Sequence, residues 1–410
     1  MHNFLRVKKI LVIKLRHIGD VLLTVPVFRA LREAFPGSII TALVNKGTED
    51  VLTGNPLLNE VLTFDRNIKK LPSLKRYLKE KDFLGEVRAR GFDMTIDLTS
   101  GDRAAVISLV SGARYRIGPV TSKGFIGKKY FYTHLAQPVG KRHTVLRDLD
   151  VISQFGIKTS NFSVDFHVPE KDRSHIKKIL SEKGVKEGST IVHVHPTSRW
   201  LFKCWRDEAM AEIIKWLAGR GLTVIVTSSP EKREIEKTKR IISLVAELTP
   251  PHILPGETGG VLDLSGKTTI KQLAAISEVS ALFLGVDSAP MHIAAAVGTP
   301  VIALFGPSGA FDWGPWDNNC SNLMSVGCLG KNNRLQPEGQ DKEGKPADQF
   351  MSPYGKQNGI QTLGRHTVIQ RDWDCIPCGR DGCGGSKVSK CLEDITSEEI
   401  KAVLADKLMG

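Results

Sequence analysis

An acidic residue follows the first apolar run of this sequence at a position suited to proton transfer. The run covers residues 9–15, and Gly19-Asp20 stands shortly after it, ahead of a second apolar stretch that ends at Pro36-Gly37. Gly19 allows a tight turn after a strand and leaves Asp20 at or near a helix N-terminus. The Asp20 carboxylate could cap that helix, which is worth about 1 kcal/mol, or it could act as a general base. Both interpretations remain open at this point.

Two hydroxyl groups and one ammonium group are gathered in the segment 193–205. Thr197, Ser198 and Lys203 follow an apolar strand pattern that ends near residue 194. Hydroxyl and ammonium groups are suitable partners for the oxygens of a phosphate or diphosphate. The alternative is a polar loop that leads into a helix expected from Arg206.

A third polar segment lies between two apolar runs at residues 282–308. Asp287-Ser288 follows a strand, and Pro290 suits the first turn of the helix that comes next. Backbone N–H groups at such a helix start can bind an anion, whereas Asp287 suits sugar or ribose hydroxyls. His292, one turn into the helix, could reach the same ligand. Glu231 begins another helix, where a nucleoside contact is the alternative to an ordinary interaction with the helix dipole.

Four of the seven cysteines are close together near the C-terminus. Cys375, Cys378, Cys383 and Cys391 have the spacing C-x2-C-x4-C-x7-C. Four thiolates over so short a span could form a structural zinc site. Packed or redox-sensitive thiols are the alternative, because this is not the paired CxxC arrangement typical of zinc sites.

The elements that must position these residues alternate between short strands and helices. This alternation predicts an α/β protein with two doubly wound parallel sheets. The expected strands are 9–15, 39–44, 61–64, 94–98, 190–194, 223–227, 281–284 and 301–305. The expected helices are 20–35, 71–90, 206–220, 230–245, 270–278 and 289–297.

We expect domains at 1–170 and 171–395, followed by a C-terminal helix at 396–410. Residues 327–372 are rich in Gly, Asn, Gln and Lys, and they predict a long irregular insertion in the second domain. The cysteine cluster at 375–391 follows that insertion. Because ligands bind at the carboxyl ends of parallel strands, we expect a cleft between the two domains.

The composition is that of a globular protein with an anionic partner. Of 410 residues, 41% are hydrophobic and 25% charged, and 57 Lys and Arg against 44 Asp and Glu leave a net charge of +13. No recognisable nucleic-acid motif accompanies this charge, which favours phosphorylated sugars or anionic lipid over nucleic acid. No apolar run reaches the ~20 residues that span a bilayer, and the N-terminal run lacks a signal-peptide cleavage site, so we expect a cytoplasmic protein.

The order of these segments resembles one known family. Gly19-Asp20 with Thr24 and Pro26, and the later Gly285-Val286-Asp287-Ser288, His292 and Gly298-Thr299-Pro300, are similar to the ADP-heptose:lipopolysaccharide heptosyltransferases of glycosyltransferase family nine. The segments 196–205 and 375–392 resemble the heptosyltransferase III branch. The resemblance extends from Lys8 to the last helix.

This resemblance implies a GT-B fold with two Rossmann-like domains facing each other across a cleft. It implies an inverting, metal-independent glycosyltransferase that moves heptose from ADP-heptose to the inner core of lipopolysaccharide. The N-terminal domain would bind the acceptor and the C-terminal domain the nucleotide sugar. Relatives carry Thr-Gly after the donor aspartate, whereas this chain has Ala289-Pro290 after Ser288, so no backbone N–H is available at position 290.

The resemblance also assigns roles to individual residues. Asp20 becomes the catalytic base, and no cofactor is required. We expect a monomer that acts on a lipid-linked acceptor at the anionic face of the inner membrane. The expected donor-binding residues are Thr197, Ser198, Lys203, Glu231, Asp287, Ser288 and His292, and the expected acceptor-binding residues are Arg103, Arg116 and Lys128. The alternatives are a GT-B enzyme for another nucleotide sugar and a non-catalytic nucleotide-sugar-binding protein.

Overall fold

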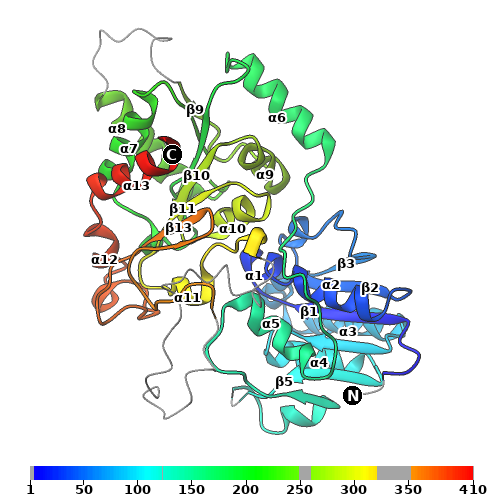
Figure 1. The fold of residues 1–410 in the computed structure, drawn as a ribbon. Coiled ribbons are helices and arrows are strands. Elements are labelled where there is room, and N and C mark those ends of the chain that lie inside the picture. The colour runs from blue at the N-terminus through cyan, green and yellow to red at the C-terminus, as the bar shows by residue number, and fades with distance from the viewer. Residues whose placement is uncertain (1–3, 122, 249–259, 321–351, 410) are drawn as a thin grey trace. The chain divides into compact units, whose positions relative to one another are not determined.

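Two parallel sheets organise the chain in the computed structural model, which describes residues 4–121, 123–248, 260–320 and 352–409 (Figure 1). The chain divides into a first unit that ends at His167 and a second that begins at Val168. The sequence prediction placed this boundary after residue 170. The predicted separate C-terminal helix instead belongs to the second unit, because Lys401 in it forms an ion pair with Glu212 at 2.5 Å.

The first unit contains a six-stranded parallel sheet with the order β3-β2-β1-β4-β5-β6. Its central strands are buried because they carry runs of β-branched and other apolar residues covered by helices. The strands are β1 Lys9–Lys14, β2 Ile39–Asn45, β3 Glu60–Phe64, β4 Met94–Asp97, β5 Tyr115–Pro119 and β6 His134–Ala136. The helices are α1 Ile18–Leu22, α2 Val25–Ala34, α3 Ser73–Ala89, α4 Asp102–Val110 and α5 Thr144–Ser153, with 3₁₀ turns η1 Glu49–Val51, η2 Arg66–Lys70 and η3 Lys128–Phe131.

The second unit repeats this order and adds an antiparallel strand at one edge. Its sheet has the order β12-β13-β11-β10-β7-β8-β9, in which only β12 is antiparallel. The strands are β7 Ile191–His195, β8 Thr223–Val226, β9 Val261–Asp263, β10 Leu282–Val286, β11 Val301–Leu304, β12 Gln361–Leu363 and β13 His366–Ile369. The helices are α6 Glu170–Glu182, α7 Asp207–Ala218, α8 Lys232–Leu248, α9 Ile270–Glu278, α10 Ala289–Ala296, α11 Ala310–Trp313, α12 Lys390–Glu393 and α13 Ser397–Met409, with 3₁₀ turns η4 Leu201–Lys203, η5 Asn318–Cys320 and η7 Cys383–Gly385.

The prediction of an irregular insertion at residues 327–372 is wrong for part of that range. Residues 327–351 lie outside the described residues, but β13 within 352–372 is a buried strand that pairs in parallel with β11. Val368 and Ile369 are 0% and 1% exposed, so they complete the core of the second unit. The run 366–369 is a strand of only four residues, which is too short to stand out beside its polar neighbours.

The prediction of one continuous helix at residues 20–35 is also wrong, because this range contains two helices. The helices α1 and α2 are separated at Leu23 and Thr24, and the Thr24 hydroxyl donates to the carbonyl of Val21 at 2.6 Å. Pro26 has no N–H to donate, so it suits the first turn of a new helix and not the interior of a continuous one.

A chain of buried polar groups fastens β7 to its neighbours. The two ring nitrogens of His193 contact the hydroxyls of Ser277 and Thr227, each at 2.8 Å, and His195 Nδ1 contacts the same Thr227 hydroxyl at 2.8 Å. Both histidines are at most 2% exposed. Burial lowers the pKa of His193 well below its usual range and that of His195 to about 3, so both imidazoles are neutral at neutral pH.

This burial predicts a loss of stability in mild acid. Unfolded histidine takes up a proton below pH ~6.5, whereas folded His195 resists protonation down to about pH 3. The free energy of unfolding should therefore have its full value above pH ~6.5. At lower pH it should fall by about 1.4 kcal/mol per pH unit for each such histidine. Denaturant unfolding between pH ~6.5 and ~4.5 should show a shallower slope for His195→Asn than for the wild type. The exposed His175→Asn serves as the control, and equal slopes in all three proteins would contradict the prediction.

Candidate functional site

Both sheets reverse their strand order at one point, and polar residues gather there in each unit. In the first sheet the reversal lies between β1 and β4, and in the second between β7 and β10. The helices that follow two such strands leave on opposite faces of the sheet, which opens a crevice at the strands' carboxyl ends. Asp20 follows β1, whereas Lys203 and Asp287 follow β7 and β10. These two sheet edges are the candidate sites.

Asp20 does not cap its helix, so that interpretation is wrong. The N-cap position of α1 is His17, no side chain caps the helix there, and Asp20 lies in the first turn. Its carboxylate is half-buried and stands at the end of the helix that favours negative charge. Gly19 is buried beneath it. The position leaves Asp20 available for chemistry.

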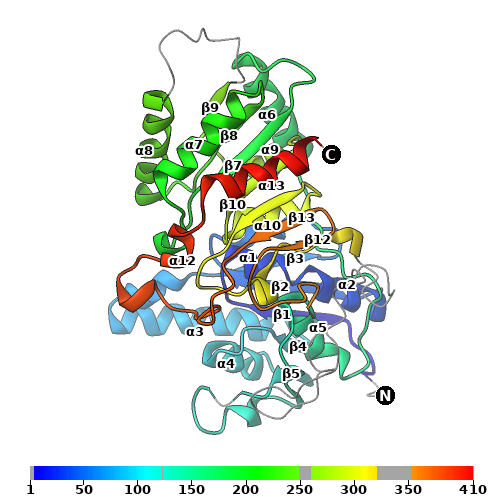
Figure 2. The ribbon, with the colours of Figure 1, turned by 60° about the vertical axis from the view of Figure 1, so that its left-hand side comes forward.

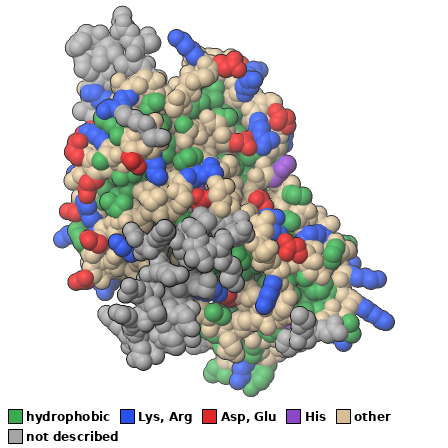
Figure 3. Space-filling view, in the orientation of Figure 1, with side chains coloured by type: hydrophobic (Ala, Val, Ile, Leu, Met, Phe, Trp, Pro, Cys, Tyr) green, Lys and Arg blue, Asp and Glu red, His purple; other side chains and the backbone are tan. Residues whose placement is uncertain are grey.

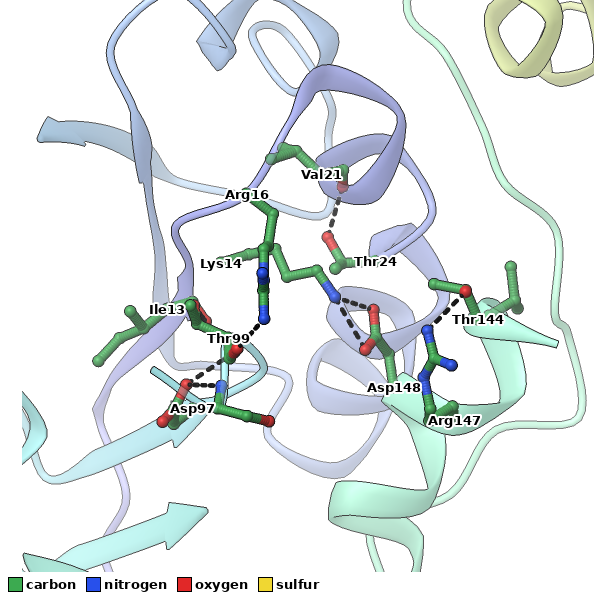
Figure 4. A network of polar contacts seen from close by, with 12 residues as sticks. Ile13, Lys14, Arg16, Val21, Thr24, Asp97, Thr99, Thr144, Arg147 and Asp148 are labelled. Atoms are coloured by element: carbon green, nitrogen blue, oxygen red, sulfur yellow. Dashed lines mark hydrogen bonds and ion pairs between the residues drawn. The ribbon is translucent and has the colours of Figure 1, made fainter. Parts of the chain in front are cut away.

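A buried ion pair lies at the carboxyl end of β1, next to this helix. The Lys14 ammonium donates to both carboxylate oxygens of Asp148 in α5, at 2.6 and 2.9 Å, and each residue is at most 5% exposed (Figure 4). Burial raises the pKa of Asp148, and the Lys14 ammonium opposes that rise. The charge of Asp20 also raises the pKa of Asp148, which places Asp20 within electrostatic reach of the pair.

The loop after β4 is fastened to β1 across the reversal point. Asp97 is fully buried, and its carboxylate accepts from the N–H groups of Thr99 and Ser100 and from the Tyr132 hydroxyl. These contacts hold Ser100 in a left-handed backbone conformation that non-glycine residues adopt rarely. The Arg16 guanidinium donates to the Thr99 carbonyl at 2.8 Å (Figure 4). Arg16, which sequence reasoning did not select, is therefore an exposed cation at the same strand end as Asp20.

In the second unit the structure brings Lys203 and Asp287 together. The Lys203 ammonium donates to Asp287 Oδ2 at 2.6 Å, and the Ser308 hydroxyl donates to the same oxygen. The Asp287 side chain is 8% exposed and that of Lys203 is 23% exposed. An ammonium group has three N–H donors, so this pairing positions Lys203 and leaves it able to bind a further oxygen.

A second buried carboxylate lies at the same sheet edge, and it is Glu234. Its two oxygens accept from the hydroxyls of Thr197 at 2.8 Å and Ser229 at 2.6 Å, and Glu234 is 4% exposed. Glu231, which the sequence analysis selected, is exposed. The difference follows from helical spacing, because Glu234 lies one turn further into the segment and faces the strand ends.

The two hydroxyl residues of the 193–205 segment are more enclosed than the sequence suggested. Thr197 is fully buried, and its hydroxyl donates a hydrogen bond to the Glu234 carboxylate. Ser198 is 5% exposed, and its hydroxyl accepts from the N–H of Trp200 at 3.3 Å. Both residues therefore shape the loop that carries Lys203.

The remaining predicted donor residues lie at the start of α10. Ser288 occupies the N-cap position without capping the helix, and its hydroxyl donates to the carbonyl of Val286 at 3.3 Å. Pro290 stands in the first turn, as predicted. His292 is 5% exposed within the same short helix.

The three residues predicted to bind the acceptor have partners within the first unit. Arg103 donates to Glu80 at 3.1 Å and lies over the Phe64 ring. Arg116 donates to the backbone carbonyls of Ala113 and Phe131, each at 2.8 Å. Lys128 is 5% exposed and donates to the Ser100 carbonyl at 2.6 Å. Arg116 and Lys128 thus hold parts of the first unit together, and their role in binding the acceptor stays a prediction.

The four clustered cysteines do not form the zinc site that was considered. Cys375 and Cys378 are exposed, Cys383 is half-buried and Cys391 is buried, and all four are free. Within the described ranges, no three His, Cys, Asp or Glu side chains are grouped so that they could hold a metal ion. Burial raises the pKa of Cys391 to about 11, and the neighbouring Cys383 and Cys378 contribute to that rise.

No helix of the described part of the chain combines the length and the apolar character that crossing a bilayer requires. Charged side chains of both signs are spread over the face of the molecule shown in Figure 3.

Comparison with known proteins identifies the family of the chain. The model of glycosyltransferase family 9 (heptosyltransferase) matches residues 82–340. Lipopolysaccharide heptosyltransferase 3 of Escherichia coli K12 is 33% identical over 315 residues, which cover 74% of this chain and 84% of that protein.

Solved structures show the same fold. The structure of the E. coli ADP-heptose lps heptosyltransferase II has a TM-score of 0.67 at 17% identity and covers 98% of both chains. The E. coli heptosyltransferase WaaC with ADP has a TM-score of 0.62 at 18% identity and covers 97% of this chain and 99% of that one. These structures have the GT-B fold, which confirms the predicted fold class of two doubly wound α/β domains. The chain is a glycosyltransferase that belongs to family 9, the heptosyltransferases.

Proposed function

We propose that this enzyme transfers heptose from ADP-heptose to the inner core of lipopolysaccharide, with inversion at the anomeric carbon. The observation that carries the proposal is the 33% identity to a protein named lipopolysaccharide heptosyltransferase 3, over most of both chains. The name of one structural relative adds ADP as its ligand, which supports an adenine nucleotide donor. The enzyme would act as a monomer in the cytoplasm on a lipid-linked acceptor, and the net charge of +13 supports its action at the anionic face of the inner membrane.

The donor would bind along the reversal edge of the second sheet. Lys203, held by Asp287, would offset the negative charge that grows on the departing diphosphate, which is the largest electrostatic demand of the reaction. Each oxygen of Glu234 already accepts one hydroxyl and has a further lone pair, so this carboxylate suits the hydroxyls of a ribose. Ser288 and His292 at the start of α10 remain predicted donor contacts. The chemistry needs no metal in this proposal.

The acceptor hydroxyl would lose its proton to Asp20 as it attacks the anomeric carbon, and ADP would leave from the opposite face. Asp148 neutralises the buried Lys14 beside this base, so that this ion pair adds no net charge next to Asp20. Arg16 is the exposed cation nearest in sequence to the base. We propose that Arg16, more than Arg116 or Lys128, meets an anionic group of the acceptor.

Donor profiling tests the proposed substrates. With a defined lipopolysaccharide core acceptor, ADP-heptose should support transfer, whereas UDP-glucose and dTDP-rhamnose should support little. Product formation should be followed by mass spectrometry and release of ADP. Preference for UDP-glucose would establish a different nucleotide sugar, and binding of donors without transfer would establish a binding protein.

Asp20→Asn should lower turnover by about 10²–10⁴-fold, because it removes the general base while keeping the side-chain shape. The affinity for ADP, measured by calorimetry, should stay within about twofold, since Asp20 is in the first unit and the proposed donor residues are in the second. Asp406→Asn, at an exposed position of α13, is the matched control. Loss of folding or of ADP binding in Asp20→Asn would instead indicate a structural carboxylate.

Glu234→Gln should weaken ADP binding by about ten- to hundredfold, because hydrogen bonds to a charged partner contribute about 1.5–3 kcal/mol. Glutamine keeps the size of the buried side chain and one acceptor oxygen, so the unit should still fold. Glu231→Gln is the control three residues away and should bind ADP as the wild type does. The reverse ranking would return the nucleoside contact to Glu231.

A further inference from the structure

The first half of α3 is exposed on the surface of the described part of the first unit. Residues 73–79 are all exposed, and among the 17 residues of α3 only Val87, near its C-terminal end, is buried. Most helical stability in proteins comes from packing an apolar face, so two turns whose residues are all exposed among the described residues are unusual. Figure 2 shows α3 as the long light-blue helix at the edge of this unit.

The exposed turns of α3 carry large apolar side chains at helical spacing. Leu74, Tyr77 and Leu78 are 71%, 64% and 46% exposed, and Leu71, just before the helix, is 37% exposed. Residues three and four apart lie on the same face of a helix, so Leu74, Tyr77 and Leu78 form one stripe, and Leu71 precedes it in the extended chain. We call residues 69–81 the docking segment. A contiguous apolar stripe on a surface marks an interaction site more often than scattered single residues do.

The docking segment is also strongly basic. It contains six cationic residues and a single acidic one, Glu80, which pairs with Arg76 at 3.7 Å and with Arg103 at 3.1 Å. The cationic residues are Lys69, Lys70, Lys75, Arg76, Lys79 and Lys81. Leucine and tyrosine flanked by lysine are typical of helices that lie in the interface of an anionic membrane.

A second group of exposed apolar side chains belongs to the same layer of the unit. The helix α4 packs against both α3 and η3. Phe125, Ile126 and Tyr130, in and before η3, are 38%, 103% and 74% exposed, and Lys129 lies over the Tyr130 ring. Figure 3 shows hydrophobic side chains beside Lys or Arg at the lower tip of this unit, below β5.

We propose that the docking segment binds the surface of an anionic phospholipid bilayer, with the stripe of Leu74, Tyr77 and Leu78 and the preceding Leu71 inserted at the headgroup level. The lysines would meet lipid phosphates, and the η3 tip would provide a second point of contact. The charge of the segment selects an anionic surface over a neutral one, and its leucines favour lipid over nucleic acid, which offers no apolar phase. The inference rests on the proposed action at a membrane and identifies the part of the chain that carries it out.

The test is co-sedimentation of the full chain with vesicles of phosphatidylglycerol and phosphatidylcholine. Lys75→Gln/Lys79→Gln should lower binding by about tenfold or more, because each basic residue near an anionic surface contributes about a factor of five. Leu74→Ser/Leu78→Ser should lower binding by about tenfold or more as well, because it removes two side chains of the inserted apolar stripe. Salt should weaken binding of the wild type. Because all four side chains are exposed, the variants should unfold at the temperature of the wild type.

Matched controls lie in the second unit. Val279→Ser removes an exposed apolar side chain, and Lys177→Gln/Lys178→Gln removes two exposed charges from α6. Both should bind vesicles as the wild type does. Transfer to a water-soluble truncated acceptor should be unchanged in the docking-segment variants, whereas transfer to an acceptor embedded in vesicles should fall with binding.

The outcomes separate this inference from the proposed function. If the docking-segment variants bind vesicles as well as the wild type does, the inference is overturned, and the proposed action of the enzyme at a membrane is unaffected. A wild type that ignores anionic vesicles would overturn both the inference and the membrane location, while transfer to the soluble acceptor would still support the enzyme activity. Variants that lose binding to single-stranded RNA but not to vesicles would show that the segment serves a nucleic acid, which contradicts the inference.

Discussion

The position of every proposed reactive group depends on one constraint of parallel sheets, which is that neighbouring strands end at the same edge. Where the strand order reverses, the chain leaves two adjacent strands toward opposite faces, and the ends of those strands are not covered by a crossover helix. This chain makes the reversal twice, between β1 and β4 and between β7 and β10. Residues far apart in sequence therefore meet without any special loop.

The contacts across each reversal show how the fold prepares a site before a ligand arrives. Lys203 and Asp287 are 84 residues apart, and their ion pair ties the loop after β7 to the end of β10. In the first unit the Thr99 hydroxyl accepts from the N–H of Leu15 and donates to the carbonyl of Ile13, which ties β4 to β1. Side chains that are held before binding lose less conformational freedom on binding, so they contribute more of their interaction energy to affinity or rate.

Local patterns were sufficient for four neighbouring strands of each sheet, β1 to β4 in the first and β7, β8, β10 and β11 in the second, whereas the strands β5, β6, β9, β12 and β13 were not predicted. The role of Asp20 stays a prediction. The helix Ile270–Glu278 was predicted with both ends, and the structure shows a local signal for its start, because Thr269 and Gln272 form a capping box. The strand β13 and the helix α6 pack against the distant elements β11 and α9. The break at Thr24, in contrast, is marked locally by Pro26. The hydrogen bond from Lys128 to the Ser100 carbonyl joins residues 28 positions apart, and the one from Thr197 to Glu234 joins residues 37 positions apart. No local spacing in the sequence reveals such contacts.

The lysines of the first unit are of two kinds, which differ in burial: buried lysines hold the fold together, and exposed lysines are available for a partner. Lys14 and Lys128 are each 5% exposed and are used to hold strand ends and loops, so their substitution would affect stability before function. The lysines of the docking segment are exposed and contribute little to folding, yet they stand beside leucines that water does not favour. A net charge of +13 alone could not distinguish these cases. Exposed cations beside exposed apolar side chains are the combination that an anionic lipid surface satisfies and that water alone does not.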